Sequence, residues 1–327
     1  MIDLIGGSGF IGTRLAERLQ ERREPFRLID KAASHRFPEH HQFADVRDTD
    51  FLRRSMSGGA VVNLAAEHRD DVRPLSLYED VNVQGARNVC QVATEKGVRT
   101  IVFTSTVALY GFAPPNTDED GAINPFNEYG RTKWEAEQVY RHWYEADPAN
   151  RTLVILRPTV VFGEQNRGNV YNLLRQIASG RFVMVGSGRN VKSMAYVENI
   201  AAFLEYSLSF APGCHVYNYV DKPDFDMNAL VATVRERLGA ARGVGFRMPY
   251  AVGLGAGYAL DLAAWATKRT FPISSIRVRK FCATTQFATS IAETGFVAPV
   301  SLEEGLRRTV QHEFLEDHRD KTVYFTE

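Results

Sequence analysis

The stretch that decides the fold is residues 6–12, which read GGSGFIG and follow the apolar run IDLI at residues 2–5. A glycine-rich turn between a strand and a helix lets the backbone approach a pyrophosphate, which rests on the helix N-terminus. Asp30 ends the next predicted strand, where an acid can accept hydrogen bonds from ribose hydroxyls and repel a 2′-phosphate. The pattern predicts a dinucleotide site that prefers NAD to NADP, a preference that Lys31 slightly weakens.

Strand-like and helix-like segments alternate outward from this turn. Apolar β-type runs fall at residues 25–30, 60–66, 99–106 and 152–163, and helical patterns fall at 13–22, 77–97 and 128–146. Such alternation is typical of a parallel sheet with helices on both faces, whose ligands bind at the carboxyl ends of the strands. We therefore predict an α/β fold with a Rossmann-type doubly wound parallel sheet.

The second half of the chain is less regular and is predicted to form a smaller α/β C-terminal substrate lobe. It contains a helical pattern at 170–180, and Ser301 with Glu304 forms a capping-box pattern before a C-terminal helix. The NAD-binding domain is expected to span residues 1–168 plus about 190–220. The lobe is expected to span about 169–189 and 221–327.

Composition narrows the class of protein. Lys+Arg and Asp+Glu are both 39, and this balance argues against nucleic acid as the main partner. Three widely spaced cysteines indicate neither a disulfide framework nor a metal site, and no signal peptide is read at the N-terminus, so a cytoplasmic location is expected. Residues 248–266 are apolar, but Pro249, three glycines and Asp261 favour a buried or interfacial helix over a membrane span.

Hydroxyl side chains end the strand predicted at residues 99–106. Thr104, Ser105 and Thr106 stand there, and strand alternation points Thr104 and Thr106 to the same side. A hydroxyl at a strand end can hydrogen-bond a substrate oxygen that gains or loses a proton. The alternative is the ordinary preference of threonine for strands.

Tyr129 and Lys133 lie four residues apart in the helix predicted at 128–146, so their side chains share one face. A free phenol has a pKa of about 10, too high for a base at neutral pH. A nearby ammonium and a positively charged nicotinamide would stabilise the phenolate and lower this pKa. Tyr129 can then remove a hydroxyl proton while hydride leaves the same carbon for the cofactor. A solvated helix pair is the alternative.

Two further strand ends have a structural and a functional interpretation. Asp45 follows residues 41–43 and either binds the adenine amine or makes a local turn bond. Residues 63–66, NLAA, either leave room for the cofactor's ribose or pack as an ordinary strand.

Taken together, these motifs resemble the extended short-chain dehydrogenase/reductase family, and within it the NAD-dependent sugar-nucleotide epimerase/dehydratase group that includes UDP-glucose 4-epimerase. The resemblance covers most of the chain. It rests on GGSGFIG, Asp30, ADV at 44–46, NLAA, NVQG at 82–85, FTSTVALYG at 103–111, YGRTK at 129–133, LRPTVVFG at 156–163 and KSMAYVENI at 192–200.

The resemblance implies a role for each matching position. Thr106 is the active-site hydroxyl, Tyr129 the acid/base, and Lys133 its partner, which also binds the nicotinamide ribose. The positions implied to contact NAD are Gly6, Gly9, Phe10, Ile11, Asp30, Lys31, Asp45, Val46, Leu64, Ala65, Ala66, Thr104, Tyr129, Lys133, Pro158, Thr159 and Val160. The positions implied to contact substrate are Thr106, Asn169, Lys192, Arg277 and Arg279.

Departures from the family pattern narrow the reaction. Val107 and Ala108 follow Thr106 where family dehydratases carry an acid pair, so 4,6-dehydration is disfavoured. Asn63 stands where many members have histidine, and Lys192 stands where many epimerases have arginine. A lysine makes a point-charge contact instead of a bidentate one, so the details of diphosphate binding are expected to differ.

The leading hypothesis is an NAD-dependent epimerase that acts at C4 of a UDP-hexose or UDP-N-acetylhexosamine through a transient 4-keto intermediate. The alternative is an NAD(P)H-dependent reductase of a 4-keto sugar nucleotide. A hydroxysteroid-type dehydrogenase, which the apolar residues 248–266 favour, and a non-catalytic dinucleotide sensor are less favoured.

The expected partners are a nucleoside-diphosphate sugar and a second copy of the chain, with neither nucleic acid nor membrane. By resemblance, the homodimer pairs helices 78–96 and 129–147 in a four-helix contact. Trp134, Gln138 and Arg141, on the face of the second helix away from Tyr129, are expected to meet the partner.

Overall fold

The computed structural model describes residues 1–69, 72–241, 243–267, 274–317 and 322–326. Seven parallel strands form one sheet in the order β11-β6-β5-β4-β1-β2-β3, which confirms the predicted doubly wound fold. These strands are β1 (Ile2–Ile5), β2 (Phe26–Asp30), β3 (His41–Phe43), β4 (Ala60–Asn63), β5 (Thr100–Thr104), β6 (Thr152–Pro158) and β11 (Gly213–Tyr219).

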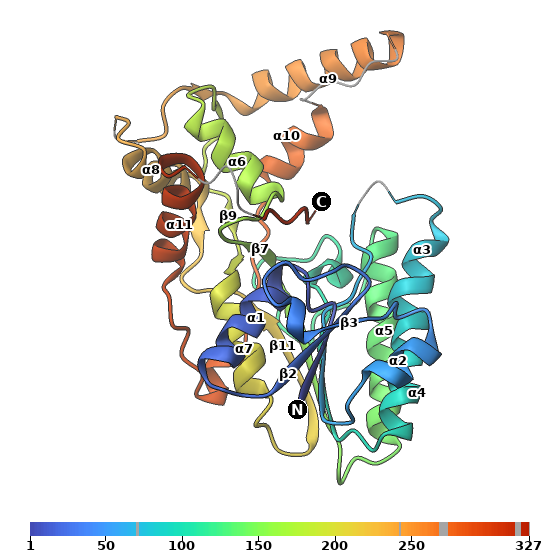
Figure 1. The fold of residues 1–327 in the computed structure, drawn as a ribbon. Helices are drawn as coiled ribbons and strands as arrows, with labels where there is room; N and C mark the ends of the chain where they lie inside the picture. The colour runs from blue at the N-terminus through green and yellow to red at the C-terminus, as the bar shows by residue number, and fades with distance from the viewer. Residues whose placement is uncertain (70–71, 242, 268–273, 318–321, 327) are drawn as a thin grey trace.

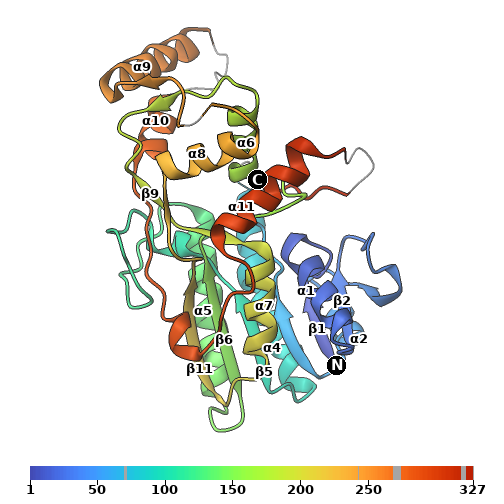
Figure 2. The ribbon, with the colours of Figure 1, turned by 90° about the vertical axis from the view of Figure 1, so that its left-hand side faces the viewer.

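Helices cover both faces of this sheet (Figures 1 and 2). On one face α1 (Phe10–Glu21) and α7 (Val197–Ser207) bury Leu15, Ile200 and their neighbours against the strands. On the other face lie α2 (Thr49–Ser55), α4 (Gly85–Glu95) and α5 (Glu128–Glu145), with a second core that contains Val89 and Tyr140. Burial of these apolar stripes is the main free-energy gain of the fold and fixes the strand ends in place.

Three parts of this sheet domain differ from the sequence prediction. The run 152–163 is two strands, because β6 ends at Pro158, which has no N–H to donate, and β7 (Val160–Phe162) pairs instead with β10 (Met194–Tyr196). The helix predicted at 77–97 is a composite of α3 (Ser76–Tyr78), a π-helical stretch (Glu79–Gln84) and α4. The short β3 and α2 were not predicted, because their apolar runs are too brief to show a period.

A smaller lobe lies beyond the carboxyl ends of the strands (Figure 1). Its core packs Leu174 of α6, Leu230 of α8 and Leu306 of α11 together. Its elements are α6 (Asn169–Ala178), β8 (Met184–Val185), β9 (Val191–Lys192), β12 (Phe225–Asp226), α8 (Met227–Arg237), β13 (Arg247–Met248), α9 (Tyr250–Thr267), α10 (Ser275–Cys282) and α11 (Leu302–Val310). The predicted cap of the last helix is present, since the Glu304 N–H donates to Ser301 Oγ at 3.2 Å.

Single turns connect the remaining segments. Three are 3₁₀ turns, at Pro38–His40, Val107–Tyr110 and Ile291–Thr294, and a π-helical turn, Gln311–Leu315, extends α11. Within the described ranges, every helix is too short or too polar to cross a membrane.

Candidate active site

The glycine turn holds its shape because no side chain fits there. Gly6 has φ +74°, and a Cβ at this position would lie 2.6 Å from the Ala65 nitrogen. A Cβ on Gly12 would lie 2.6 Å from the Gly7 carbonyl oxygen, so α1 packs directly on the turn. Gly9 precedes Phe10, the first residue of α1, and neither a side-chain cap nor a first-turn acid occupies the helix N-terminus. Its free N–H groups therefore suit an anion such as a pyrophosphate.

The Asp30 carboxylate lies beside this turn, at the end of β2. The Ser8 N–H donates to Asp30 Oδ2 at 3.0 Å, and the Ala32 N–H donates to Oδ1 at 2.9 Å. The exposed Lys31 follows it directly. A negative charge held at this place fits the ribose side of a dinucleotide without a 2′-phosphate.

Buried polar atoms without a partner give an independent test of the fit. Among the described residues, eight buried side-chain N and O atoms have no hydrogen-bond partner, and Ser8 Oγ and Thr104 Oγ1 are two of them. Ser8 lies in the glycine turn and Thr104 ends β5, so these two atoms lie in the predicted cofactor segments. Buried hydroxyls normally find a partner, and a bound dinucleotide would supply one. The residues present therefore fit NAD.

The segment after β3 is engaged locally. Arg47 donates two hydrogen bonds to the Asp45 carboxylate, from Nη2 to Oδ2 at 2.6 Å and from Nε to Oδ1 at 3.0 Å. These hydrogen bonds lower the pKa of Asp45. The Arg47 N–H also donates to Asp45 Oδ1 at 3.0 Å, which is the local turn bond expected as the alternative. Val46 is buried against Gly85, where a Cβ would lie 2.9 Å from Val46 Cγ2. An adenine contact by Asp45 stays a prediction.

The segment after β4 approaches the glycine turn closely. The Leu64 N–H donates to the Ile5 carbonyl at 2.8 Å, and Ala65 lies against Gly6. Asn63 is structural here, since its Nδ2 donates to the Tyr140 hydroxyl at 2.6 Å and its Oδ1 accepts the Ala65 N–H at 3.0 Å. Small side chains at positions 65 and 66 leave the turn accessible to a cofactor.

The structure brings Thr106 and Tyr129 together. Thr106 follows β5 and its Oγ1 accepts the Ala108 N–H at 3.1 Å, while Tyr129 lies in the first turn of α5. The two meet because a Cβ on Gly130 would lie 2.7 Å from the Ala108 carbonyl oxygen, so glycine lets the 3₁₀ turn touch the helix. Burial raises the pKa of Tyr129 to about 12, and its hydrogen bond with Thr106 acts in the opposite direction.

Lys133 lies one turn further along α5 and is only 1% exposed. Its ammonium lies 4.1 Å from the centroid of the Phe103 ring. Burial lowers the pKa of Lys133 to about 7, and the negative charge of Glu137 partly offsets this. The sequence led us to expect that Lys133 lowers the pKa of Tyr129. In the protein without a cofactor, burial raises this pKa instead. The positive charge of NAD⁺ is therefore needed to favour the phenolate.

A buried ion pair connects α5, the helix of Tyr129 and Lys133, to the sheet. Arg157 of β6 contacts the Glu137 carboxylate through two hydrogen bonds, Nε to Oε1 at 2.9 Å and Nη2 to Oε2 at 2.7 Å. Arg157 Nη1 also donates to the Tyr110 hydroxyl at 2.7 Å, and that hydroxyl donates to Asn218 Oδ1 at 2.8 Å. The network ties α5 to β6, β11 and the 3₁₀ turn after Thr106, so it fixes the relative positions of the three proposed catalytic residues.

Sequence reasoning missed two residues beside Lys133. His68 Nε2 is buried without a hydrogen-bond partner among the described residues, and burial lowers the pKa of His68, with the charge of Lys133 acting in the same direction. Asn82 accepts the Glu67 N–H at 2.8 Å and donates to Thr132 Oγ1 at 3.0 Å. It thereby holds the 67–68 segment against α5. The signal in the sequence was Asn82 between two valines of an amphipathic helical pattern, because an amide that becomes buried usually forms its hydrogen bonds.

The loop after β6 provides an apolar wall. Thr159 is buried, and both its N–H and its hydroxyl donate to the Tyr219 carbonyl, at 3.0 and 3.1 Å. Pro158 ends β6, and Val160 leaves its side chain 38% exposed at the strand end. This arrangement suits the predicted contact with a nicotinamide.

Four of the five predicted substrate residues lie on the lobe, and the fifth, Thr106, follows β5 in the sheet domain. Lys192 Nζ donates to the Lys280 carbonyl at 3.0 Å, so β9 and the end of α10 meet. Burial lowers the pKa of Lys192 to about 8. Arg277 and Arg279 are exposed on α10, where Arg279 bonds the Tyr258 hydroxyl of α9, and Asn169 is exposed at the start of α6. The structure joins Lys192 to α10, which the sequence could place only loosely.

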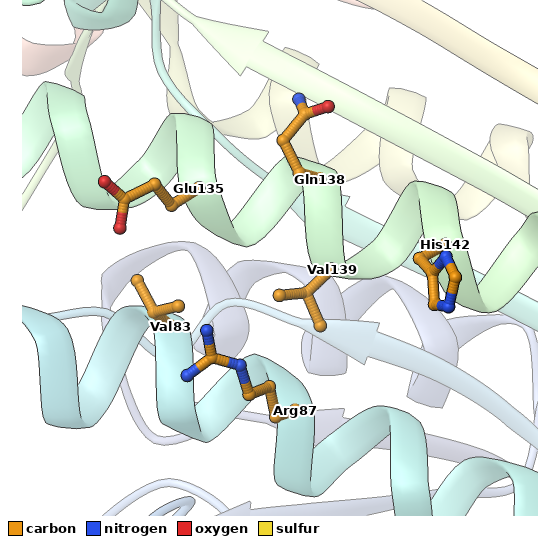
Figure 3. Close-up of a pocket in the computed structure, with 6 residues that line it drawn as sticks. All are labelled: Val83, Arg87, Glu135, Gln138, Val139 and His142. Atoms are coloured by element: carbon orange, nitrogen blue, oxygen red, sulfur yellow. The ribbon is translucent and has the colours of Figure 1, made fainter.

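An open hollow of about 490 Å³ lies away from this chemistry, between α5 and the segment that contains the π-helical stretch and α4 (Figure 3). Val83, Arg87, Glu135, Gln138, Val139 and His142 line it. Of the three residues expected to meet a partner, only Gln138 lies here. Trp134 packs on the cluster of Leu109, Tyr110 and Phe287, and Arg141 Nη1 lies 3.5 Å from Cys214 Sγ. Trp134 and Arg141 are therefore only partly exposed, and their contact with a partner copy stays a prediction.

Replacing Asp30 with serine is expected to weaken NAD binding by about 10- to 100-fold, because hydrogen bonds to a charged acceptor are lost. NADP should bind relatively better, since the charge that repels its 2′-phosphate is gone. Calorimetric titration of both nucleotides into cofactor-stripped protein measures the two affinities. Asp50→Ser removes an exposed carboxylate of α2 and should change neither affinity. An unchanged ratio of NAD to NADP affinity in Asp30→Ser would contradict the role of Asp30.

A dinucleotide-binding sheet with a hydroxyl at the end of β5, and with a tyrosine and a lysine one turn apart on α5, defines an enzyme of the extended short-chain dehydrogenase/reductase class. The sequence model of the NAD dependent epimerase/dehydratase family matches residues 2–218, and the chain belongs to this family. This confirms the resemblance read from the motifs, including dependence on NAD.

Known proteins extend this similarity. The chain is 52% identical, over 99% of its length and 98% of the relative, to an N-acetyl-alpha-D-glucosaminyl-diphospho-ditrans,octacis-undecaprenol 4-epimerase of Escherichia coli O157:H7. It is 29% identical, over 60% of its length and 63% of the relative, to a UDP-glucose 4-epimerase of Vibrio cholerae.

Solved structures share the fold at low sequence identity. The UDP-glucose 4-epimerase of Thermotoga maritima with UDP-glucose has a TM-score of 0.74 at 20% identity, covering 96% of this chain and 99% of that one. The Thermus thermophilus UDP-glucose 4-epimerase complex with NAD has a TM-score of 0.71 at 21% identity, covering 95% and 98%.

Proposed function

We propose that this chain is an NAD-dependent epimerase that inverts C4 of an N-acetylhexosamine carried on a diphosphate. The observation that carries the proposal is the 52% identity, along 99% of the chain, to an epimerase whose substrate is a polyprenyl-diphospho-N-acetylglucosamine. We favour a polyprenol over a nucleoside on the far phosphate for the same reason. A UDP-sugar, the expectation from the sequence, is the second candidate, and the similarity to UDP-glucose 4-epimerases favours it.

Thr106, Tyr129 and Lys133 have separate roles in the proposed oxidation at C4. When bound, NAD⁺ supplies the hydride acceptor and a positive charge beside the phenol. Thr106 hydrogen-bonds the 4-oxygen of the sugar, and Tyr129 removes its proton as the C4 hydrogen leaves as hydride. Lys133 holds the nicotinamide ribose and stabilises the phenolate. Oxidation at C4 thus gives a 4-keto sugar, a reduced cofactor and a protonated Tyr129.

The return step decides the outcome. The keto sugar presents its other face, accepts the hydride back at C4, and takes the proton from Tyr129, so no net oxidation occurs. Val107 packs against Leu109 and Tyr110, and neither Val107 nor Ala108 can move a proton, which argues against a dehydratase.

The diphosphate is proposed to bind at the lobe. Lys192 and one of Arg277 or Arg279 supply positive charge, and Asn169 lies at the N-terminus of α6. The Lys192 ammonium is a point charge, whereas an arginine would bind phosphate in a fixed bidentate geometry. We therefore expect Lys192 to tolerate different groups beyond the second phosphate.

Because burial lowers the pKa of Lys192 to about 8, its charge is lost as the pH rises through that value. Affinity for the diphosphate-linked sugar should therefore be constant below about pH 7 and fall above about pH 8. Calorimetry in a Tyr129→Phe background measures binding without turnover. The Lys192→Arg variant keeps its charge, so its affinity for the diphosphate-linked sugar should stay constant up to about pH 9. A parallel loss of affinity in Lys192→Arg would contradict the assignment.

One experiment tests the proposed function. The purified protein is denatured and the supernatant assayed for released NAD. Native protein is then incubated, without added cofactor, with polyprenyl-diphospho-N-acetylglucosamine, UDP-N-acetylglucosamine or UDP-galactose, and the released sugars are analysed. Conversion of the lipid-linked sugar alone supports the proposal. Conversion of only the UDP-sugars favours the second candidate. Consumption of NADH with a 4-keto sugar, without epimerisation, would leave the reductase.

Three accompanying assignments complete the proposal. We propose a homodimer through the helices that line the hollow of Figure 3, and the domain limits given by the sequence. We propose a cytoplasmic location, which the free thiols of Cys90, Cys214 and Cys282 support, because a reducing compartment keeps thiols unpaired.

A further inference from the structure

Helix α9 exposes an apolar face at the far end of the lobe. The exposed fractions are 55% for Val252, 49% for Tyr258, 66% for Leu262 and 80% for Trp265. Gly255, Ala256 and Ala259 are exposed between them, so exposed positions recur every three or four residues along one side of the helix. We call Val252, Tyr258, Leu262 and Trp265 the α9 face. It contradicts the buried alternative expected from the sequence.

The side of α9 that packs on α10 carries an acidic residue, which a helix on a protein surface would normally expose to water. Asp261 is the one charged residue in α9, and its Oδ2 accepts the Ser275 N–H of α10 at 3.1 Å. Gly257 lies against α10, since a Cβ there would lie 2.8 Å from Ser275 Cα. The glycine and the acid therefore face the protein while the large apolar side chains face outward. This polarity is the reverse of that of a helix that covers a core.

The shape of the lobe makes this face accessible. Figures 1 and 2 show α9 as the outermost element of the lobe, packed on α10 and extending past the rest of the molecule. At 1.5 Å per residue its 18 residues measure about 27 Å, and it is not apolar enough to be a span. Tryptophan and tyrosine are the side chains enriched where a bilayer meets water.

Positive charge adjoins the apolar face. Arg279 of α10 bonds the hydroxyl of Tyr258, and its guanidinium lies 5.6 Å from the centroid of that ring. An apolar face with aromatic side chains and a neighbouring cation matches the chemistry of a helix that lies in the plane of an anionic membrane surface.

We propose that the α9 face docks on the surface of a lipid bilayer that contains anionic lipids. Leu262 and Trp265 enter the boundary between headgroups and acyl chains, and Arg279 meets headgroup phosphates. The inference stands on the α9 face and not on the substrate proposed above, and it reverses the expectation that membranes are not a partner. It has a consequence for that substrate, because Lys192 bonds the end of α10 and α10 packs on α9. A sugar attached to a membrane lipid would reach the site from this side.

Co-sedimentation of the full-length protein with vesicles tests the proposal. The wild type should bind vesicles of phosphatidylcholine mixed with phosphatidylglycerol, and bind less to phosphatidylcholine alone or in high salt. Leu262→Glu/Trp265→Glu should weaken binding by at least about 10-fold. Phe43→Glu/Val297→Glu places the same two charges at other exposed apolar sites and should bind as the wild type does. Tryptophan fluorescence of the wild type should shift to the blue on adding vesicles, and that of Trp265→Phe, which keeps Trp134 and Trp143, should shift less.

Other outcomes would overturn the proposal. Wild type that stays in solution with both kinds of vesicle excludes a membrane role. Equal losses in the two double variants show that added charge, and not the α9 face, weakens binding. If Leu262→Glu/Trp265→Glu lowers the molar mass in light scattering without affecting vesicle binding, the face is a contact between two copies. Epimerisation of a water-soluble, short-chain prenyl-diphospho-N-acetylglucosamine, measured in parallel without vesicles, keeps failure of this proposal separate from failure of the proposed function.

Discussion

Tyr129→Phe is expected to lower kcat by about 10²- to 10⁴-fold, the range that a positioned acid/base contributes. The variant keeps the ring and loses only the hydroxyl that bonds Thr106. Oxidation at C4 needs a group to take the proton from the 4-oxygen, and Tyr129 is assigned this role because its hydroxyl bonds Thr106, the proposed partner of that oxygen. The variant should still bind NAD, because the glycine turn and Asp30 are untouched. Turnover of the diphosphate-linked sugar and NAD released on denaturation measure the two effects.

A second tyrosine of the same helix provides the control. Tyr144 lies near the C-terminal end of α5, far along the helix from Thr106, and Tyr144→Phe should keep full activity. The assignment of the acid/base would be wrong if Tyr129→Phe turned over as fast as Tyr144→Phe. Loss of NAD from Tyr129→Phe would instead assign the hydroxyl to cofactor binding.

Arg157→Met is expected to lower the free energy of unfolding by about 3–5 kcal/mol, because it leaves the Glu137 carboxylate buried without its cation. The two residues are fully buried, and Glu137 lies one turn from Lys133 on α5. The Tyr110 hydroxyl loses a hydrogen-bond donor as well. Guanidinium unfolding followed by circular dichroism measures the loss.

The double variant Glu137→Met/Arg157→Met separates an unpaired charge from lost packing. Replacing both members of a buried pair with apolar residues of similar size often costs little stability, so the double variant should recover most of the loss. Its activity should stay low, because the charge of Glu137 holds the pKa of Lys133 up and its loss favours the neutral amine. A double variant as unstable as Arg157→Met would show that packing and not charge dominates.

The sequence was a sufficient guide to the local chemistry of the sheet domain. Gly6 and Gly12 could be assigned because a glycine turn between strand and helix has one main physical reason, and the structure shows no room for a Cβ at either position. Tyr129 and Lys133 could be paired because helical spacing is fixed by the backbone. Asp45 shows the limit of such assignments. Its partner Arg47 is only two residues away, and the sequence could not decide between this local bond and a contact with adenine.

The lobe could not be predicted in the same way. Lys192 and Lys280 are 88 residues apart, and no local pattern indicates that they meet. Trp134 was assigned to an outer face from helical spacing alone, but spacing does not say which side of α5 covers the cluster around Tyr110. The strand predicted at 152–163 divides at Pro158 because β7 finds a partner, β10, that lies far along the chain.

By itself, the sequence indicated the alternation of strands and helices in a parallel sheet, the dinucleotide turn, the NAD preference of Asp30 and the set of Thr106, Tyr129 and Lys133, because each follows from backbone periodicity and the chemistry of neighbouring residues. Only the tertiary structure decided the electrostatics of that set and the orientation of α9. Burial, which a sequence does not display, moves the pKa of Tyr129 to about 12 and that of Lys133 to about 7. Packing on α10 turns Asp261 inward and leaves Leu262 and Trp265 outward, because a helix that is apolar on every side reveals its free face only when its neighbours are in place.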